Sequence, residues 1–249
     1  MLKIENVDVM GWEAAIRGMR NPMNSWEQSD SGYNYVTDTH VIIDGELIHQ
    51  NPFERIFCVG KNDLDLMTRL RNAGTDHRKF MRMIIVYVDI TAPLYWWKEF
   101  DTYKVGTVAN SCSTMHKIAD KEFTLEDFSH EHLFDLMIGD VEFLPTEILE
   151  NTIICLNECR KRYLKALKTK NPSVPAKEYW WQMIQLLPSS YNQRRTIMLN
   201  YEVLANMYKS RKNHKLDEWH VFCDWIMGLP YSELITGAFD KQEADKNDV

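Results

Sequence analysis

The residues best suited to chemistry lie near the C-terminal end of the chain, in the segment Leu187–Trp219. After Pro188 this segment runs more than twenty residues without Pro or Gly, which predicts a long helix. Amides and cations at helical spacing suit a bound anion or an amide-bearing ring. The alternative is a solvated face whose charges suit the helix dipole. The polar residues are Asn192, Arg195, Asn200, Glu202, Asn206, Lys209, Arg211 and His214.

A second candidate block places cations before a predicted strand and aromatic residues after it. Aromatic rings interleaved with cations suit a stacked heteroaromatic ligand with a phosphate tail. The alternative is that the tryptophans belong to the core and the cations flank it. The block runs from residue 76 to 104 and contains His77, Arg78, Lys79, Arg82, Tyr95, Trp96, Trp97, Lys98 and Lys104.

Small hydroxyl and amide groups follow in the stretch VANSCSTM, residues 108–115. Such a stretch can hold phosphate through hydroxyls and backbone N–H groups, or it can form a capping turn. Cys112 within it raises the alternative of a nucleophile, although no neighbouring group in the sequence accounts for a lowered thiol pKa.

Near the N-terminus, Arg17 and Arg20 lie three residues apart and could clamp a phosphate or face solvent. The sequence has neither a P-loop nor a GxGxxG motif, so neither standard nucleotide cradle is expected. The eight histidines show no zinc-ligand spacing, and we expect no metal.

The composition limits the function classes. In 249 residues, 45% hydrophobic and 12% aromatic content supports a sizeable core. The net charge of −7 argues against non-specific nucleic-acid binding. No apolar run reaches the length of a membrane span or resembles a signal peptide. Five scattered cysteines, with no Cys-x-x-Cys pair, predict reduced thiols and a cytoplasmic location.

Hydrophobic periodicity predicts one helix-rich α/β (α+β) domain over residues 1–238, followed by a charged, disordered tail over 239–249. Strands are expected at residues 2–10 and 81–90, the second being rich in β-branched residues. A loop with two prolines is expected at 168–181. Helices are expected at 11–23, 62–74, 93–105, 145–169, within 187–219 and at 216–229.

The C-terminal segment resembles the substrate-binding region of the flavin-dependent thymidylate synthase superfamily. That family has Leu-Pro followed by Asn, Leu and Arg, and the matching positions here are Leu187, Pro188, Asn200, Leu204 and Arg211. In the family, the Asn and Arg lie at the flavin and nucleotide site. The family's next stretch, Ala-Gln/Glu-Ile-Arg, is replaced here by residues 215–219.

A second region resembles the same family in its layout. A turn with His77, a strand, Pro93 and Lys98-Glu99-Phe100 precede the region of the family's RHRxxSxNExSxRY signature. Both arginines and the His of its RHR triplet are absent. The string NSWEQSDSGY, residues 24–33, echoes the signature's second half by chance or as an N-terminal ligand loop. Signature positions are matched by Lys104 and Thr107 and, with one residue inserted, by Asn110 and Ser113.

The resemblance implies a helix-rich fold with a central, mostly antiparallel sheet, assembled as a homotetramer. It further implies FAD, reduced by NADPH, in transfer of a one-carbon unit from methylene-tetrahydrofolate to dUMP, a methyltransferase reaction that needs no protein nucleophile. The alternatives are a hydroxymethylating variant and a non-catalytic nucleotide-binding or assembly protein. Nucleotide binding is assigned to Arg211, Lys98, Lys104, Asn110 and Ser113, and cofactor binding to His77, Arg78, Asn200, Asn206 and Thr107.

Overall fold

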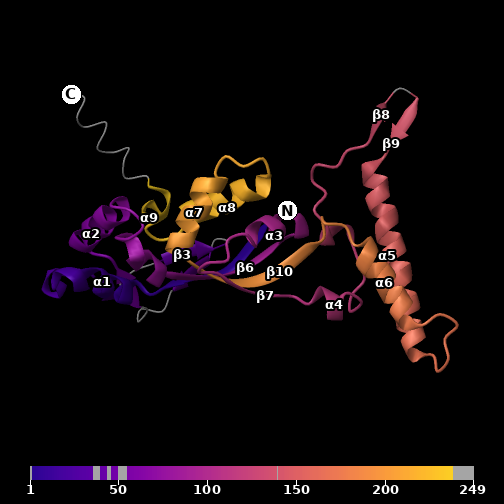
Figure 1. Ribbon diagram of the computed structural model, residues 1–249, viewed down its shortest axis with the longest axis horizontal. Coiled ribbons are helices and arrows are strands. Elements are labelled where there is room, and N and C mark those ends of the chain that lie inside the picture. The colour runs from indigo at the N-terminus through magenta and orange to yellow at the C-terminus, as the bar shows by residue number, and fades with distance from the viewer. Residues whose placement is uncertain (1, 36–39, 44–45, 50–54, 139, 238–249) are drawn as a thin grey trace.

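Four strands from distant parts of the chain form the central sheet of the protein (Figure 1). The computed structural model describes residues 2–35, 40–43, 46–49, 55–138 and 140–237. The sheet order is β1-β6-β10-β7, and every neighbouring pair is antiparallel. The strands are β1 (Lys3–Met10), β6 (Ile85–Pro93), β10 (Asn192–Asn200) and β7 (Val108–Ser111).

The centre of the sheet is the pairing of β6 with β10, which runs from Pro93 opposite Asn192 to Ile85 opposite Asn200. Side chains alternate between the two faces of a strand. On β6, Val86 and Val88 are therefore buried on one face, whereas Tyr87 is 40% exposed on the other. One face of the sheet thus carries the core.

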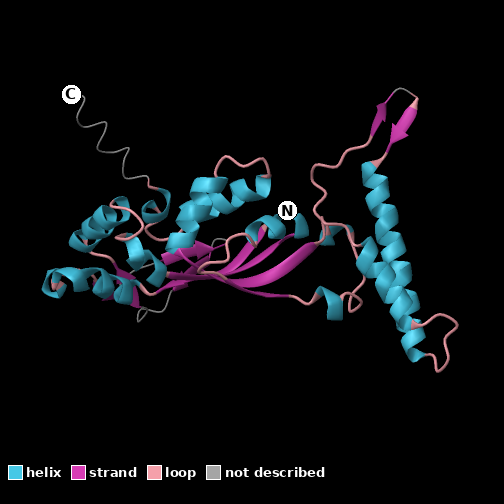
Figure 2. Ribbon diagram, in the orientation of Figure 1, coloured by secondary structure: helices cyan, strands magenta, loops and turns pink. Residues whose placement is uncertain are grey.

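Helices α3 (Leu94–Phe100), α7 (Tyr201–Arg211) and α8 (Asp217–Met227) cover the buried face (Figure 2). The contact between α3 and α8 is aromatic: Trp96 lies 4.8 Å from Trp219 and 5.7 Å from Phe222, measured between ring centroids. Trp96 and Trp97 are both at most 1% exposed. These tryptophans therefore belong to the core, which decides between the two alternatives for them.

One end of the sheet carries α1 (Trp12–Arg20), α2 (Lys61–Asn72) and α9 (Glu233–Thr236) (Figure 1). The segment of chain between α1 and α2 contains two short antiparallel ladders. One pairs β2 (Gly32–Tyr35) with β5 (Arg55–Cys58), and the other pairs β3 (His40–Ile43) with β4 (Glu46–His49).

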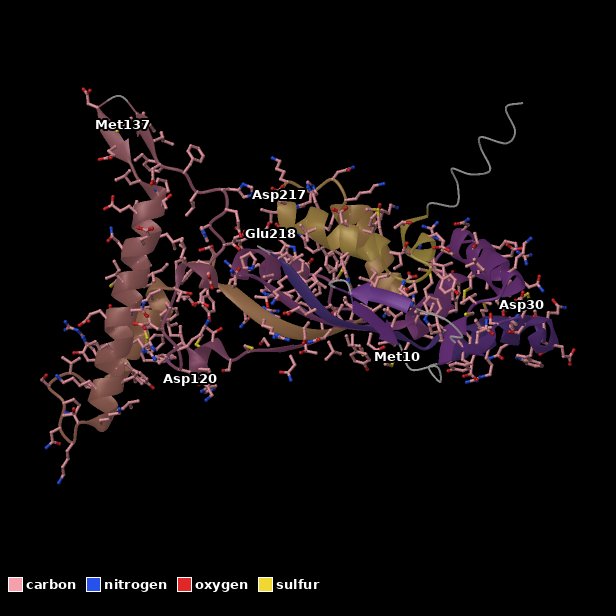
Figure 3. All side chains as sticks on the ribbon, turned by 180° about the vertical axis from the view of Figure 1, so that it is seen from behind. Met10, Asp30, Asp120, Met137, Asp217 and Glu218 are labelled. Atoms are coloured by element: carbon pink, nitrogen blue, oxygen red, sulfur yellow. The ribbon has the colours of Figure 1, made fainter. Side chains whose placement is uncertain are left out.

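An arm projects at the other end, built from α5 (Pro145–Lys168) and α6 (Ala176–Leu186) (Figure 1). It has its own small core, in which Phe128, Leu156 and Met183 are buried. The hairpin of β8 (Leu136–Ile138) and β9 (Val141–Phe143) forms its tip, where Figure 3 labels Met137. The short α4 (Thr114–Lys117) precedes the arm in the chain. Among the described residues, no helix combines the length and apolarity needed to cross a bilayer.

The predicted fold class, helix-rich with a central antiparallel sheet, is confirmed, but one major element was predicted wrongly. The segment Leu187–Trp219 is not one long helix, because β10 occupies its first part and α7 begins only at Tyr201. The strand predicted at 81–90 begins at Ile85, after a 3-10 turn. Part of the loop predicted at 168–181 is the start of α6. The predicted tail at 239–249 lies outside the described residues.

A buried ion pair joins the first two helices. Arg20 on α1 donates from Nε to Asp63 Oδ1 on α2 at 2.6 Å, and the two side chains are 4% and 0% exposed. Arg20 therefore neither clamps a phosphate nor faces solvent. The loop NSWEQSDSGY is held by the same carboxylate, because the hydroxyls of Ser29 and Ser31 donate to Asp63 Oδ2 at 2.7 and 2.6 Å.

Burial raises the pKa of Asp63, but hydrogen bonds from Ser31, Ser29 and Arg20, with the charge of Arg20, outweigh it. The net result is a pKa below the ordinary value of 3.8. A carboxyl whose pKa is lower in the folded state stabilises the fold above its unfolded pKa. This contribution is lost as the pH falls through the folded-state pKa.

We predict that Asp63→Asn lowers the free energy of unfolding by about 3–5 kcal/mol at pH 7, because it leaves the buried Arg20 charge unpaired. Urea unfolding followed by circular dichroism measures this loss, which should shrink at pH values below 3.8. The control is Asp65→Asn on the exposed face of α2, expected to stay within about 0.5 kcal/mol. Equal losses in both variants would contradict this role for Asp63.

Candidate functional site

Arg211 ends α7 directly beside the end of α3. Its Nη1 donates to Glu99 Oε2 at 2.7 Å, and its Nε donates to Tyr103 Oη at 2.9 Å. The guanidinium carbon lies 4.7 Å from the centroid of the Trp219 ring, within cation–π range. Arg211 is thus tied to its own chain through charge, hydrogen bonding and stacking.

Glu99 is the hub of this cluster. Its Oε2 also accepts from Trp219 Nε1 at 3.0 Å and lies 3.2 Å from His214 Nε2. Within the described part of the chain, Arg211 Nη2 makes no hydrogen bond. A guanidinium has five N–H donors in a fixed fork, so Arg211 can still donate from this edge to a bound anion. We name Glu99, Tyr103, Arg211, His214 and Trp219 the Arg211 cluster.

Asn200 is placed at the junction between β10 and α7, where it caps the helix. Its Oδ1 accepts from the backbone N–H of Val203 at 2.9 Å, which satisfies one free donor of the first turn. Its Nδ2 donates to the carbonyl of Gly106 at 3.3 Å. Gly106 has φ of +81°, and a Cβ there would lie 2.5 Å from that Nδ2. The contacts of Asn200 are therefore structural, and its assignment to a cofactor stays a prediction.

A pocket of about 320 Å³ brings together Arg78 and Asn206, two of the residues predicted to bind the cofactor. Arg78 donates from Nη2 to Asn206 Oδ1 at 3.5 Å, and its Nε lies 2.9 Å from Glu202 Oε2. We name this the α7 pocket, and its lining is strongly basic. The lining residues are Arg71, Arg78, Ala205, Asn206, Tyr208, Lys209, Lys212, Ile235 and Thr236.

The charge of the α7 pocket is only partly neutralised. Glu202 pairs with Arg78, and its side chain is 9% exposed. Within the described ranges, neither Lys209 nor Lys212 has an acidic partner within 4.0 Å. A concave site with unneutralised cations on a helix suits an anionic ligand.

Most of the other predicted residues lie on α3 or in the chain between α3 and α4, and His77 lies before β6. Lys98, Lys104 and Asn110 are exposed, on α3, on the loop after it and on the edge strand β7. Thr107 donates to the carbonyl of Tyr103 at 2.5 Å. Ser113 caps α4 by accepting from the N–H of His116, so this part of VANSCSTM is the capping turn. His77 is exposed and precedes Arg78 in the chain.

Arg195 and Asn192 do not share a helix with Arg211, contrary to the prediction. Arg195 lies on β10, stacks 4.2 Å over the Trp97 ring and donates to Asp101 at 2.8 Å. Asn192 accepts from the Ser129 hydroxyl at 3.0 Å. Both side chains fasten neighbouring segments to the sheet.

The sequence predicted neither the ion pairs of Glu99 and Glu202 nor the place of Lys212 in the α7 pocket. Glu99 and Glu202 neutralise Arg211 and Arg78, yet nothing local links these positions, which lie 112 and 124 residues apart. Lys212 was not given a role, although it belongs to the cluster of Arg, Lys and His in which the predicted helix was expected to end. Its spacing of three from Lys209 on one helix was the available signal.

Comparisons with known proteins add to this geometry. No protein-family model matches the sequence, and no curated protein matches it. Among solved structures, thymidylate synthase X of Helicobacter pylori with FAD and dUMP matches with a TM-score of 0.57 at 15% identity, over 95% of this chain and 98% of that one. A second structure of that flavin-dependent enzyme, also with FAD and dUMP, matches with a TM-score of 0.56 at 16% identity, over 94% and 99%.

The chain has the fold of the flavin-dependent thymidylate synthases. The resemblance predicted from the Leu187–Trp219 pattern is confirmed at this level, and the match covers nearly the whole of both chains. In the described ranges, no group of three or more His, Cys, Asp or Glu side chains is arranged to hold a metal.

We predict that Asn200→Ala lowers the free energy of unfolding by about 1–2 kcal/mol, since α7 loses its cap. The matched variant Asn200→Asp keeps the acceptor for Val203 and loses only the donor to Gly106, so it should be less destabilised. Urea unfolding measures both. If Asn200→Ala unfolds like the parent chain, the capping contact does not contribute.

Proposed function

We propose that this chain is a diverged flavin-dependent thymidylate synthase-like protein that binds FAD and a pyrimidine deoxynucleotide. In this proposal it transfers a one-carbon unit from methylene-tetrahydrofolate to dUMP or a related nucleotide. The observation that carries the proposal is the α7 pocket, which gathers Arg78 and Asn206 with unneutralised lysines. It does so on a fold whose solved examples hold FAD and dUMP.

The residues of the α7 pocket fit the phosphate groups of FAD. A diphosphate needs several cations, and Arg78, Lys209 and Lys212 provide them around a pocket of about 320 Å³. FAD is larger than this volume, so we propose that a second chain of a homotetramer completes its site. When bound, FAD would supply the redox chemistry, with NADPH as the reductant.

The Arg211 cluster supports the proposal for the nucleotide. Arg211 Nη2 keeps donors for a phosphate or a pyrimidine carbonyl, while Glu99 holds the guanidinium in place. Lys98 on α3 and Lys104 on the loop after it are exposed and could contribute further positive charge. We assign Asn110 and Ser113 to the same site as amide and hydroxyl donors.

A second candidate is a non-catalytic nucleotide-binding or assembly protein on this fold. The specific observation in its favour is that Glu99 neutralises Arg211, at 2.7 Å, in a chain that also lacks the signature arginines. A hydroxymethylating variant would use the same residues as the main proposal. Mass spectrometry of products from dUMP or deoxycytidylate with folate donors separates the three, since only the non-catalytic protein leaves every nucleotide unchanged.

We predict that replacing both Lys209 and Lys212 with Ala weakens FAD binding at least tenfold, because charge-assisted contacts are worth about 1.5–3 kcal/mol each. Titration of flavin fluorescence measures the dissociation constant. The control is Lys215→Ala, an exposed lysine outside the α7 pocket, which should leave the constant unchanged. Equal constants for all three chains would place FAD elsewhere.

We predict opposite effects at the two partners of the Arg211 cluster. Arg211→Ala should weaken dUMP binding by about 1.5–3 kcal/mol, the cost of a charge-assisted contact. Glu99→Gln should tighten it, because it removes a negative charge next to the guanidinium. Isothermal titration calorimetry measures both, with exposed Arg82→Ala as the control. Unchanged affinity in the first two variants would favour the assembly protein.

A further inference from the structure

Tyr103 lies on the loop that follows α3 and contacts the Arg211 guanidinium through both its hydroxyl and its ring. Its Oη accepts from Arg211 Nε at 2.9 Å, and its ring centroid lies 5.5 Å from the guanidinium carbon. Because Tyr103 is the acceptor in this hydrogen bond, its own O–H proton is not used by Arg211. In the described part of the chain, that proton is donated to no other group.

The fork of Arg211 determines where a ligand atom can lie next to this hydroxyl. In a guanidinium, Nε and Nη2 present two parallel N–H bonds along one edge, as in bidentate contacts with carboxylates. Tyr103 Oη occupies the Nε position of this edge, whereas Nη1 donates to Glu99 Oε2 at 2.7 Å. An oxygen that accepts from Nη2 along this edge therefore lies beside Tyr103 Oη, within reach of its O–H proton.

Two donors of different kinds thus converge on the position of one ligand oxygen. The Nη2–H bond belongs to the charged guanidinium, and the Tyr103 O–H bond is a neutral donor that acts over about 2.5–3.0 Å. Converging donors bind an oxygen that carries or gains negative charge, such as a phosphate oxygen or a ring carbonyl. The Arg211 side chain is 16% exposed and Tyr103 is half-buried, so both are accessible from solvent.

The other members of the Arg211 cluster have no donor left for this position. Trp219 Nε1 and His214 Nε2 both lie against Glu99 Oε2, at 3.0 and 3.2 Å. His214 Nδ1 accepts from a backbone N–H at 3.2 Å, so both ring nitrogens are engaged. Among the described residues of the cluster, free donors therefore remain on Arg211 and Tyr103.

The loop that carries Tyr103 is fastened at several points. The Tyr103 N–H donates to the carbonyl of Phe100 at 3.0 Å, and the Tyr103 carbonyl accepts from the Thr107 hydroxyl at 2.5 Å. Gly106, with φ of +81°, turns the chain, and its carbonyl accepts from Asn200 Nδ2 at 3.3 Å. A hydroxyl on a fixed loop needs little reorganisation to meet a ligand, so more of its hydrogen bond contributes to affinity.

We infer that Tyr103 is a ligand-binding residue, whose O–H donates to the same nucleotide oxygen as Arg211 Nη2. The inference rests on the proposed function and adds to it a residue that the sequence analysis left without a role. The oxygen belongs to the phosphate or to a ring carbonyl. At a ring carbonyl, the two donors would also stabilise negative charge that develops during one-carbon transfer.

The first test is isothermal titration calorimetry of dUMP with the parent chain and with Tyr103→Phe, which removes the hydroxyl and keeps the ring. We expect the dissociation constant to rise at least about fivefold, as for one lost hydrogen bond. Tyr87→Phe, at a 40% exposed tyrosine on the open face of the sheet, is the matched control and should leave the constant unchanged. Circular dichroism checks that each variant is folded.

A second substitution separates direct donation from a role in orienting Arg211. Incorporation of 3-fluorotyrosine at position 103 makes the phenol a stronger donor and its oxygen a weaker acceptor. Direct donation to the ligand predicts tighter dUMP binding. A hydroxyl that acts only by accepting from Arg211 predicts weaker binding, which would overturn the inference.

Ligand analogues identify the oxygen. They are deoxyuridine, which lacks the phosphate, and dUMP with sulfur, a weaker acceptor, at the 2- or 4-carbonyl. The difference between the parent chain and Tyr103→Phe should shrink for the analogue that lacks the contacted oxygen. Equal dUMP affinity in these two chains would overturn the inference and leave the proposed function standing. A folded parent chain that binds no dUMP would overturn both.

Discussion

The structure depends on the antiparallel pairing of β6 with β10, which joins segments about a hundred residues apart along their full length. Because the strands run in opposite directions, α3 leaves one end of this pair and α7 leaves the other. Both helices return over the same face of the sheet, so their last turns meet where Glu99 contacts Arg211. The aromatic core beneath them and the Asn200 cap maintain this meeting point.

This arrangement divides the available positive charge between two places on α7. At its end, Arg211 is held by Glu99 and stacked on Trp219, which leaves part of its donor set for a ligand. On another face of the same end of the helix, Lys209 and Lys212 line a pocket with Arg78. In the proposed function the first place serves the nucleotide and the second serves FAD. The carboxylate of Glu99 that holds Arg211 also competes with any anionic ligand for the guanidinium.

The fold class could be predicted from the sequence because periodicity and a matched Leu-Pro, Asn, Leu and Arg pattern agreed. The strand β10 could not, since NQRRTIMLN lacks breakers and its polar residues lie at spacings that also fit a helix. Only pairing with β6, a non-local contact, decides its state. The site was partly predictable: Arg78 and Asn206 do meet, whereas Glu99 and Glu202 reach their arginines only through the tertiary fold.

In the proposed function, the cationic surface of α7 binds the phosphate groups of a flavin. The most direct measurement is the visible absorption spectrum of the purified full-length protein, before and after incubation with FAD and removal of free flavin. The account predicts a bound-flavin band that persists after removal and that changes shape when dUMP is added. A protein that stays colourless after FAD incubation, and whose folding is intact by circular dichroism, would contradict it.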